Sequence, residues 1–167
     1  MPPDALLNRY LASGAYTDCY VIEMARPVSH AEFVEAFYTT PAFKLERLIL
    51  HLLASRPSTD AQARQLARGE ISSFAAWSVE ARAPDQLLLR DFSGRTRSWL
   101  MVTASRNPDP IGIRLYFGSA VVPVRNPETG RTSLGPVFTA LLGFHKVYSR
   151  ILLRAAERRL FRKAAPG

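Results

Sequence analysis

Apolar side chains recur in one long C-terminal segment at alternating intervals of three and four residues, and this pattern constrains the fold more than any other. The row consists of Phe138, Leu141, His145, Tyr148, Leu152 and Ala155. This spacing places them all on one face of an α-helix. Gly135 and Pro136 precede the row, and proline is favoured at the first position of a helix. The pattern therefore predicts one long helix that ends at about Arg162.

The segment before this helix has a period of two residues, which is typical of β-strands. It predicts four strands, over Phe74–Ala81, Gln86–Phe92, Arg95–Thr103 and Ile113–Val122. In the first of them, Trp77, Val79 and Ala81 are expected on one face. Because most of the connections are short and rich in turn residues, we expect the four strands to form an antiparallel meander.

An earlier strand and two or three helices are predicted before the meander. Aromatic and β-branched residues favour a strand over Tyr16–Met24. Ser29 and Glu32 have the spacing of a capping box, which predicts a helix start. Thr40 and Pro41 predict a second start, and Asp60–Arg68 is expected to form a short third helix.

The length of 167 residues suits one domain. A hydrophobic share of 47% and a charged share of 22% are normal for a globular protein and argue against disorder or a disulfide scaffold. We therefore expect a single α+β domain over residues 14–162, an N-terminal extension over residues 1–13 and a short tail over residues 163–167.

The single cysteine, Cys19, excludes an internal disulfide and any metal site built from several cysteines. Three histidines are few for a metal site, so we predict neither a metal nor a cofactor. The N-terminus lacks the pattern of a signal peptide, and no apolar stretch approaches the ~20 residues of a membrane span. We expect a soluble, cytoplasmic protein.

The order of a strand, two or three helices, a run of antiparallel strands and one long C-terminal helix resembles the START-like superfamily, also called helix-grip or SRPBCC. The resemblance covers about residues 14–162 and concerns element order, because this superfamily has no short signature. The segments Tyr16–Tyr20 (YTDCY) and Arg95–Trp99 (RTRSW) look most like bacterial members of unknown function. The resemblance implies a curved antiparallel sheet, the long C-terminal helix packed across it, and a pocket for an apolar ligand between them.

Seven residues are candidates for lining that pocket. His145 and Tyr148 lie on the apolar row of the long helix, where an imidazole and a hydroxyl are suited to orienting a ligand. Arg97 is suited to binding a carboxylate or phosphate. The other candidates are strand residues that are expected to point inward: Trp77, Asp91, Trp99 and Phe117. For each of them, packing in the core or exposure at the surface is the alternative interpretation.

These features favour a binding protein for a small apolar or amphipathic molecule, a lipid among them. The alternative is an enzyme of cyclase or hydrolase type that uses the same pocket, with His145 as a base and Asp91 or Arg97 to orient it. The motifs of zinc proteases, serine hydrolases and nucleotide-binding proteins are absent from the sequence, and we assign no catalytic residue.

A net charge of +8 favours acidic partners, and much of this charge is concentrated at the C-terminus. Arg150, Arg154, Arg158 and Arg162 recur every four residues and form one positive stripe on the predicted helix. This stripe predicts contact with an anionic membrane surface or an acidic partner, and the alternative is a solvated helix end. Nucleic acid is the weaker alternative, because no recognition motif accompanies the charge.

Overall fold

The computed structural model of the protein describes residues 1–45, 58–105, 112–125, 132–134 and 136–164. The expected second helix starts where predicted, because residues 41–45 are helical and the Phe43 amide donates to Thr40 Oγ1 over 3.2 Å. The rest of that helix lies outside the described residues. The side chains of Phe138 and Leu141, at the start of the apolar row, also lie outside them.

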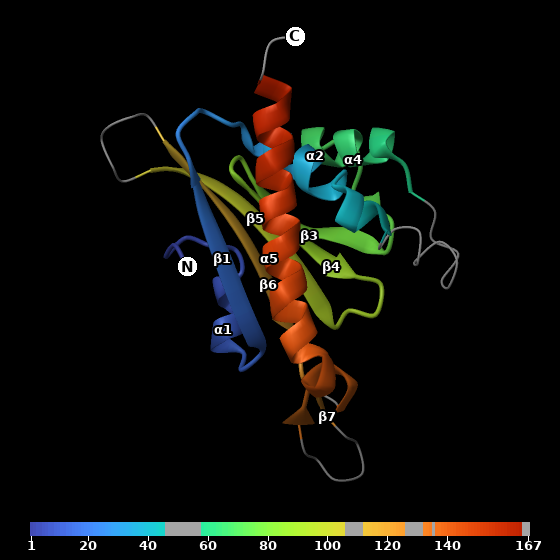
Figure 1. The fold of residues 1–167 in the computed structure, drawn as a ribbon. Helices are drawn as coiled ribbons and strands as arrows, with labels where there is room; N and C mark the ends of the chain where they lie inside the picture. The colour runs from blue at the N-terminus through green and yellow to red at the C-terminus, as the bar shows by residue number, and fades with distance from the viewer. Residues whose placement is uncertain (46–57, 106–111, 126–131, 135, 165–167) are drawn as a thin grey trace.

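Six antiparallel strands form one curved sheet in the spatial order β1-β6-β5-β4-β3-β2 (Figure 1). The strands are β1 (Tyr16–Met24), β2 (Ser73–Phe74), β3 (Trp77–Ala83), β4 (Gln86–Asp91), β5 (Thr96–Ala104) and β6 (Ile113–Val121). Strands β3 to β6 form the predicted meander, and β1 adds to its open side by pairing with β6. A second, two-stranded sheet joins β7 (Val124–Arg125) to β8 (Thr132–Ser133).

Helix α5 (Pro136–Ala164) runs across one face of the large sheet, as Figure 1 shows. Helices α2 (His30–Tyr38) and α4 (Asp60–Arg68) lie beside it, and the short α1 (Asn8–Ala12) precedes β1. This arrangement confirms the predicted α+β class, with a curved antiparallel sheet crossed by a long C-terminal helix. None of the described helices is long and apolar enough to cross a membrane.

The predicted helix starts are confirmed by their capping hydrogen bonds. Ser29 Oγ accepts from the amide of Glu32, whose carboxylate accepts from the Ser29 amide in return. Thr59 and Gln62 make the same reciprocal pair at the start of α4. Gly69 ends that helix with a φ of 80°, a conformation that glycine adopts without steric cost.

The expected strand Phe74–Ala81 is interrupted in two places. Ala75 has a φ of 53°, and this turn separates β2 from β3. A register shift between Val79 and Ala81 then moves Ala81 to the opposite face of the sheet, where it packs with Trp99. The prediction that Trp77, Val79 and Ala81 share one face was therefore wrong, because a bulge breaks the period of two.

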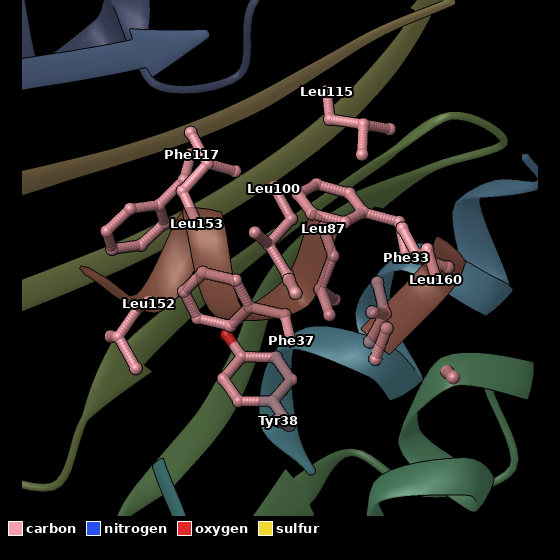
Figure 2. Packing of buried hydrophobic residues seen from close by; sticks show 14 of the residues in the cluster. Phe33, Phe37, Tyr38, Leu87, Leu100, Leu115, Phe117, Leu152, Leu153 and Leu160 are labelled. Carbon is pink, nitrogen blue, oxygen red and sulfur yellow. The ribbon is translucent and has the colours of Figure 1, made fainter. Parts of the chain in front are cut away.

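Buried residues lie on both faces of the sheet. The larger cluster fills the space between the sheet, α2 and α5, where Phe37, Phe117 and Leu153 are buried (Figure 2). The smaller cluster lies on the opposite face and contains Trp99 and Leu7, both without exposed surface. The N-terminal residues thus cover the outer face of the sheet, and the larger cluster supports the site.

Close packing at Gly118 gives a stability prediction. A methyl group at this position would lie 2.9 Å from the carbonyl oxygen of Asp18 and 2.9 Å from Cε3 of Trp99. We expect Gly118→Ala to lower the free energy of unfolding by about 1–3 kcal/mol, because the neighbouring backbone cannot move away cheaply. In the matched control Gly143→Ala, a methyl group on α5 meets nothing within 4 Å and should stabilise the helix by up to about 1 kcal/mol. Urea denaturation measures both, and equal effects would contradict the prediction.

Candidate functional site

A cavity of about 430 Å³ lies between the sheet and α5. Phe37 and Phe43 form one wall, and Phe117 and Trp77 of the sheet form another. Helix α5 contributes Phe144, His145, Tyr148, Ser149 and Leu152. The lining is mainly aromatic and aliphatic, with a few polar groups, and this composition is typical of a site for a small molecule.

Asp18 of β1 joins the sheet to α5 at one end of this cavity. Its carboxylate accepts from the Ser119 hydroxyl over 2.6 Å and from the Ser119 amide over 3.1 Å. His145 Nε2 lies 2.8 Å from Ser119 Oγ and 3.2 Å from Asp18 Oδ2. The hydroxyls of Tyr16 and Tyr20 also donate to Asp18, over 3.2 and 3.3 Å. We call these five residues the Asp18 cluster.

The strand register brings this cluster together. Asp18 pairs directly with Ser119 across β1 and β6, and Tyr16 and Tyr20 lie two residues to either side of Asp18 on the same face. Ser119 shares its face with Phe117, two residues away, which belongs to the main core. The contact of His145 with Asp18 and Ser119 therefore links α5 to the β1–β6 pair near the start of β1.

The pKa values in the cluster favour a charged Asp18 with protonated tyrosines. Burial alone raises the pKa of Asp18, but the hydrogen bonds from His145 and Ser119 outweigh it and hold the pKa below its usual value. Burial and the nearby carboxylate raise the pKa of Tyr16 and of Tyr20. Asp18 therefore stays an acceptor at neutral pH and both phenols stay donors.

The geometry of the cluster differs from that of a catalytic triad. In a triad, the acid and the nucleophile contact opposite nitrogens of the histidine. Here Asp18 and Ser119 both contact Nε2 of His145, and the Ser119 hydroxyl donates to Asp18. This arrangement fixes the imidazole and holds the Ser119 proton on the carboxylate side, so it does not activate Ser119 as a nucleophile.

Two residues that line the cavity carry buried polar atoms without a hydrogen-bond partner among the described residues. They are Ser149 Oγ on α5 and Trp77 Nε1 on β3. An unsatisfied buried donor or hydroxyl costs about 1–3 kcal/mol. A bound molecule that offers an oxygen to these atoms would recover part of that cost.

Five of the seven predicted pocket residues line the cavity: Trp77, Arg97, Phe117, His145 and Tyr148. The guanidinium of Arg97 is engaged elsewhere, however. It lies 2.6 Å from the carboxylate of Glu80, and it also donates to Tyr10 and to the carbonyl of Gly94. Arg97 is thus tied into an ion pair, and its role as a binder of anionic ligands stays a prediction without structural support.

Asp91 and Trp99 are not among the residues that line the cavity, and the prediction that Trp99 points inward was wrong. Asp91 ends β4 and accepts from the amides of Arg95 and Thr96 over 2.8 and 3.0 Å, which closes the β4–β5 turn. Trp99 lies on the outer face, where its Nε1 donates to Gln86 over 3.0 Å. Asp91 therefore orders a turn, and Trp99 packs beneath the N-terminal residues.

Asp18, Ser119 and Ser149 were not among the residues predicted for the site. The available signal for Asp18 was an acidic residue in the middle of an aromatic strand, on the same face as Tyr16 and Tyr20. The register that joins it to Ser119 links residues about a hundred positions apart, and no local pattern reveals such a pairing. Ser149 lies directly after Tyr148 and is not part of the predicted apolar row. It is buried all the same, because the buried face of α5 is wider than that row.

Comparisons with known proteins add no functional information. No family model matches the chain, and no curated protein matches it. Among solved structures, the chain is similar to an uncharacterized protein from Rhizobium leguminosarum at 9% sequence identity and a TM-score of 0.30. That match covers 87% of this chain and 97% of the other. A likeness at this level supports no argument about fold or function.

The Asp18 cluster gives a prediction for stability and its dependence on pH. We expect Asp18→Asn to lower the free energy of unfolding by about 2 kcal/mol at neutral pH, because the amide leaves some of the five donor groups around it unpaired. The lowered pKa of Asp18 means that its contribution is present above its ordinary value of 3.8 and is lost as the pH falls below it. The variant should therefore lose less stability than the wild type between neutral and acidic pH.

The matched control for this experiment is Glu23→Gln, a substitution on β1 like Asp18→Asn, which breaks the exposed ion pair with Arg114 of β6. An exposed pair contributes at most about 1 kcal/mol. Urea denaturation at several pH values measures both variants. Equal losses of stability in the two variants would show that the Asp18 cluster does not anchor α5.

Proposed function

We propose that the protein binds a small, mainly apolar molecule in the cavity between the sheet and α5. The observation that carries this proposal is the 430 Å³ cavity itself, since its volume is within the range of sites for small ligands. The arrangement of sheet and helix also agrees with the resemblance to the START-like superfamily, which we propose as the family.

The charges around the cavity favour a neutral ligand. Asp18 is compensated by His145 and Ser119, and the Arg97 guanidinium is compensated by Glu80. A ligand carboxylate or ammonium in the apolar part of the cavity would lose its hydration without gaining an uncommitted counter-ion from these pairs. An aromatic or aliphatic body suits the walls better.

One polar group on the ligand is also favoured. The indole nitrogen of Trp77 is a donor only, while the Ser149 hydroxyl both donates and accepts. A carbonyl, ether or hydroxyl oxygen can accept a hydrogen bond from either of these groups. We therefore propose a neutral amphipathic molecule with one such oxygen.

Binding is better supported than catalysis. An enzyme that uses His145 as its base was expected to orient it with Asp91 or Arg97, and both of these side chains are bound elsewhere. His145 instead directs Nε2 toward Asp18 and Ser119, where it links α5 to the sheet. This geometry suits a residue that forms part of the wall of a binding site.

The test uses the neutral probe N-phenyl-1-naphthylamine, whose fluorescence rises in an apolar environment. We expect the full-length protein to bind it, and we expect Ser149→Leu to weaken binding by about tenfold or more, because the added carbons occupy the cavity. Removing the unpaired hydroxyl should leave thermal stability unchanged or higher. Fluorescence titration measures affinity, and circular dichroism checks the fold.

The matched control is Lys146→Leu, which adds the same side chain to an exposed position of α5. It should bind the probe like the wild type. Equal weakening by both substitutions, or the absence of any saturable binding to the wild type, would overturn the proposal. Native mass spectrometry after incubation with a cell extract then identifies a retained neutral molecule.

A further inference from the structure

The side of α5 that faces away from the sheet carries a second hollow. This groove has a volume of about 790 Å³ and is lined by Pro41, Val147, Arg150, Ile151, Arg154, Ala155, Arg158, Arg159 and Arg162. It belongs to a different surface from the cavity, because its residues alternate along the helix with the buried Leu152, Leu153 and Ala156. We call this surface the outer face of α5.

Large apolar side chains are exposed along and beside the outer face. Phe144 is 67% exposed, Val147 54% and Ile151 51%. Phe161, nearer the C-terminus, is 52% exposed. Single exposed apolar residues are common, but a row on one helix marks a surface that is suited to an apolar partner.

Arginines surround this apolar row and continue it toward the C-terminus. Arg150, Arg154, Arg158 and Arg162 are exposed. Glu157 is the one acidic residue from position 150 onward, and it lies 3.2 Å from Arg154. Among the described residues, no carboxylate forms a salt bridge with Arg158 or Arg162. The outer face thus combines exposed apolar side chains with an excess of positive charge.

One guanidinium in the groove also has an unsatisfied donor. Arg159 is half-buried, and its Nε has no hydrogen-bond partner within the described part of the chain. A buried guanidinium N–H is costly to leave unpaired and is well suited to a phosphate oxygen. The charge complementarity of the groove therefore favours an anionic group rather than a neutral one.

We propose that the outer face of α5 binds the surface of a bilayer that contains anionic phospholipids. Phe144, Val147 and Ile151 enter the boundary between headgroups and acyl chains, while the arginines extend their charged ends to the phosphates. A nucleic acid offers the same phosphates but no apolar layer, so it would leave the exposed phenyl and aliphatic side chains without a partner. The combination of both surface types on one helix favours the membrane.

The outer face also adjoins the mouth of the cavity. Phe144 lines the cavity, stacks on Tyr148 with ring centres 5.8 Å apart, and is still largely exposed. A protein that rests on the bilayer by this face would hold the cavity mouth close to the membrane. The inference about the membrane does not require that the cavity binds a ligand.

The experiment is co-sedimentation of the full-length protein with vesicles. The protein should bind vesicles of phosphatidylcholine mixed with phosphatidylglycerol, and it should leave vesicles of phosphatidylcholine alone in the supernatant. The double variant Arg158→Gln/Arg162→Gln should bind the anionic vesicles about 30-fold more weakly, since each arginine near such a surface contributes about a fivefold factor. Binding should also weaken at high salt, and Ile151→Ser should weaken it at low salt.

The matched control is Arg64→Gln/Arg90→Gln, which removes the same charge from exposed positions on α4 and β4. It should bind like the wild type, as should Ser149→Leu, because the assay contains no ligand for the cavity. Equal losses in the two double variants, equal binding to neutral vesicles, or no binding would overturn the inference. A short DNA duplex that binds more tightly than the vesicles would overturn it in favour of nucleic acid.

Discussion

The packing of α5 against the sheet is the interaction on which the rest of the structure depends. Its C-terminal half buries Leu152, Leu153 and Leu160 almost completely (Figure 2). Burial of one such side chain contributes roughly 1.5–3 kcal/mol. The apolar anchor thus lies in one half of the helix, beside α2 and β6.

The other half of α5 is held differently. Gly143 and Phe144 are exposed, and His145 keeps only part of its surface buried as it reaches Asp18 and Ser119. Among the described side chains of this half, His145 links the helix to the sheet, and Tyr148 packs against the main core and donates to the carbonyl of Ala42. The cavity lies where the contacts of α5 change from the polar link through His145 to the apolar packing of the C-terminal half.

This division explains why a charged aspartate is tolerated so near the core. An isolated carboxylate at this depth would lose its hydration at a high cost in free energy. Asp18 instead accepts from Ser119, His145 and two tyrosines, and this network also orients every donor around it. The cluster therefore links α5 to the sheet through hydrogen bonds. Because the Asp18 carboxylate already has its partners, it does not offer a ligand an unpaired charge.

Local signals in the sequence predicted the elements well. The capping pair of Ser29 and Glu32 depends on residues three positions apart, and α2 begins in the structure where this pair predicts. The direction in which a strand residue points was harder to predict. Leu87, Leu88 and Leu89 are all fully buried, because the N-terminal residues cover the outer face of the sheet. With both faces apolar, alternation could not distinguish inner from outer positions, and Trp99 was assigned to the wrong face.

The site was less predictable because its residues meet through long-range pairing. His145 was recognisable from its place on the apolar row, whereas its partners come from β1 and β6 and depend on the register of a strand pair. The bulge near Val79 had no comparable signal, since it replaces the regular period of the strand by a local irregularity. The positions of the helices could thus be predicted from residue spacing. The residues that meet in the site could be identified only from the pairing of the strands.

Helix α5 is shared by both proposed binding surfaces. Tyr148 and Leu152 face the cavity, while Val147 and Ile151 face outward from the same two turns. A ligand that fills the cavity would contact Tyr148 and Leu152, and it would thereby restrain the orientation of the outer face. A bilayer that holds the outer face would in turn restrict the same part of the helix. Since both contacts restrain one element, each would favour the other, and the coupling between them would be equal in both directions.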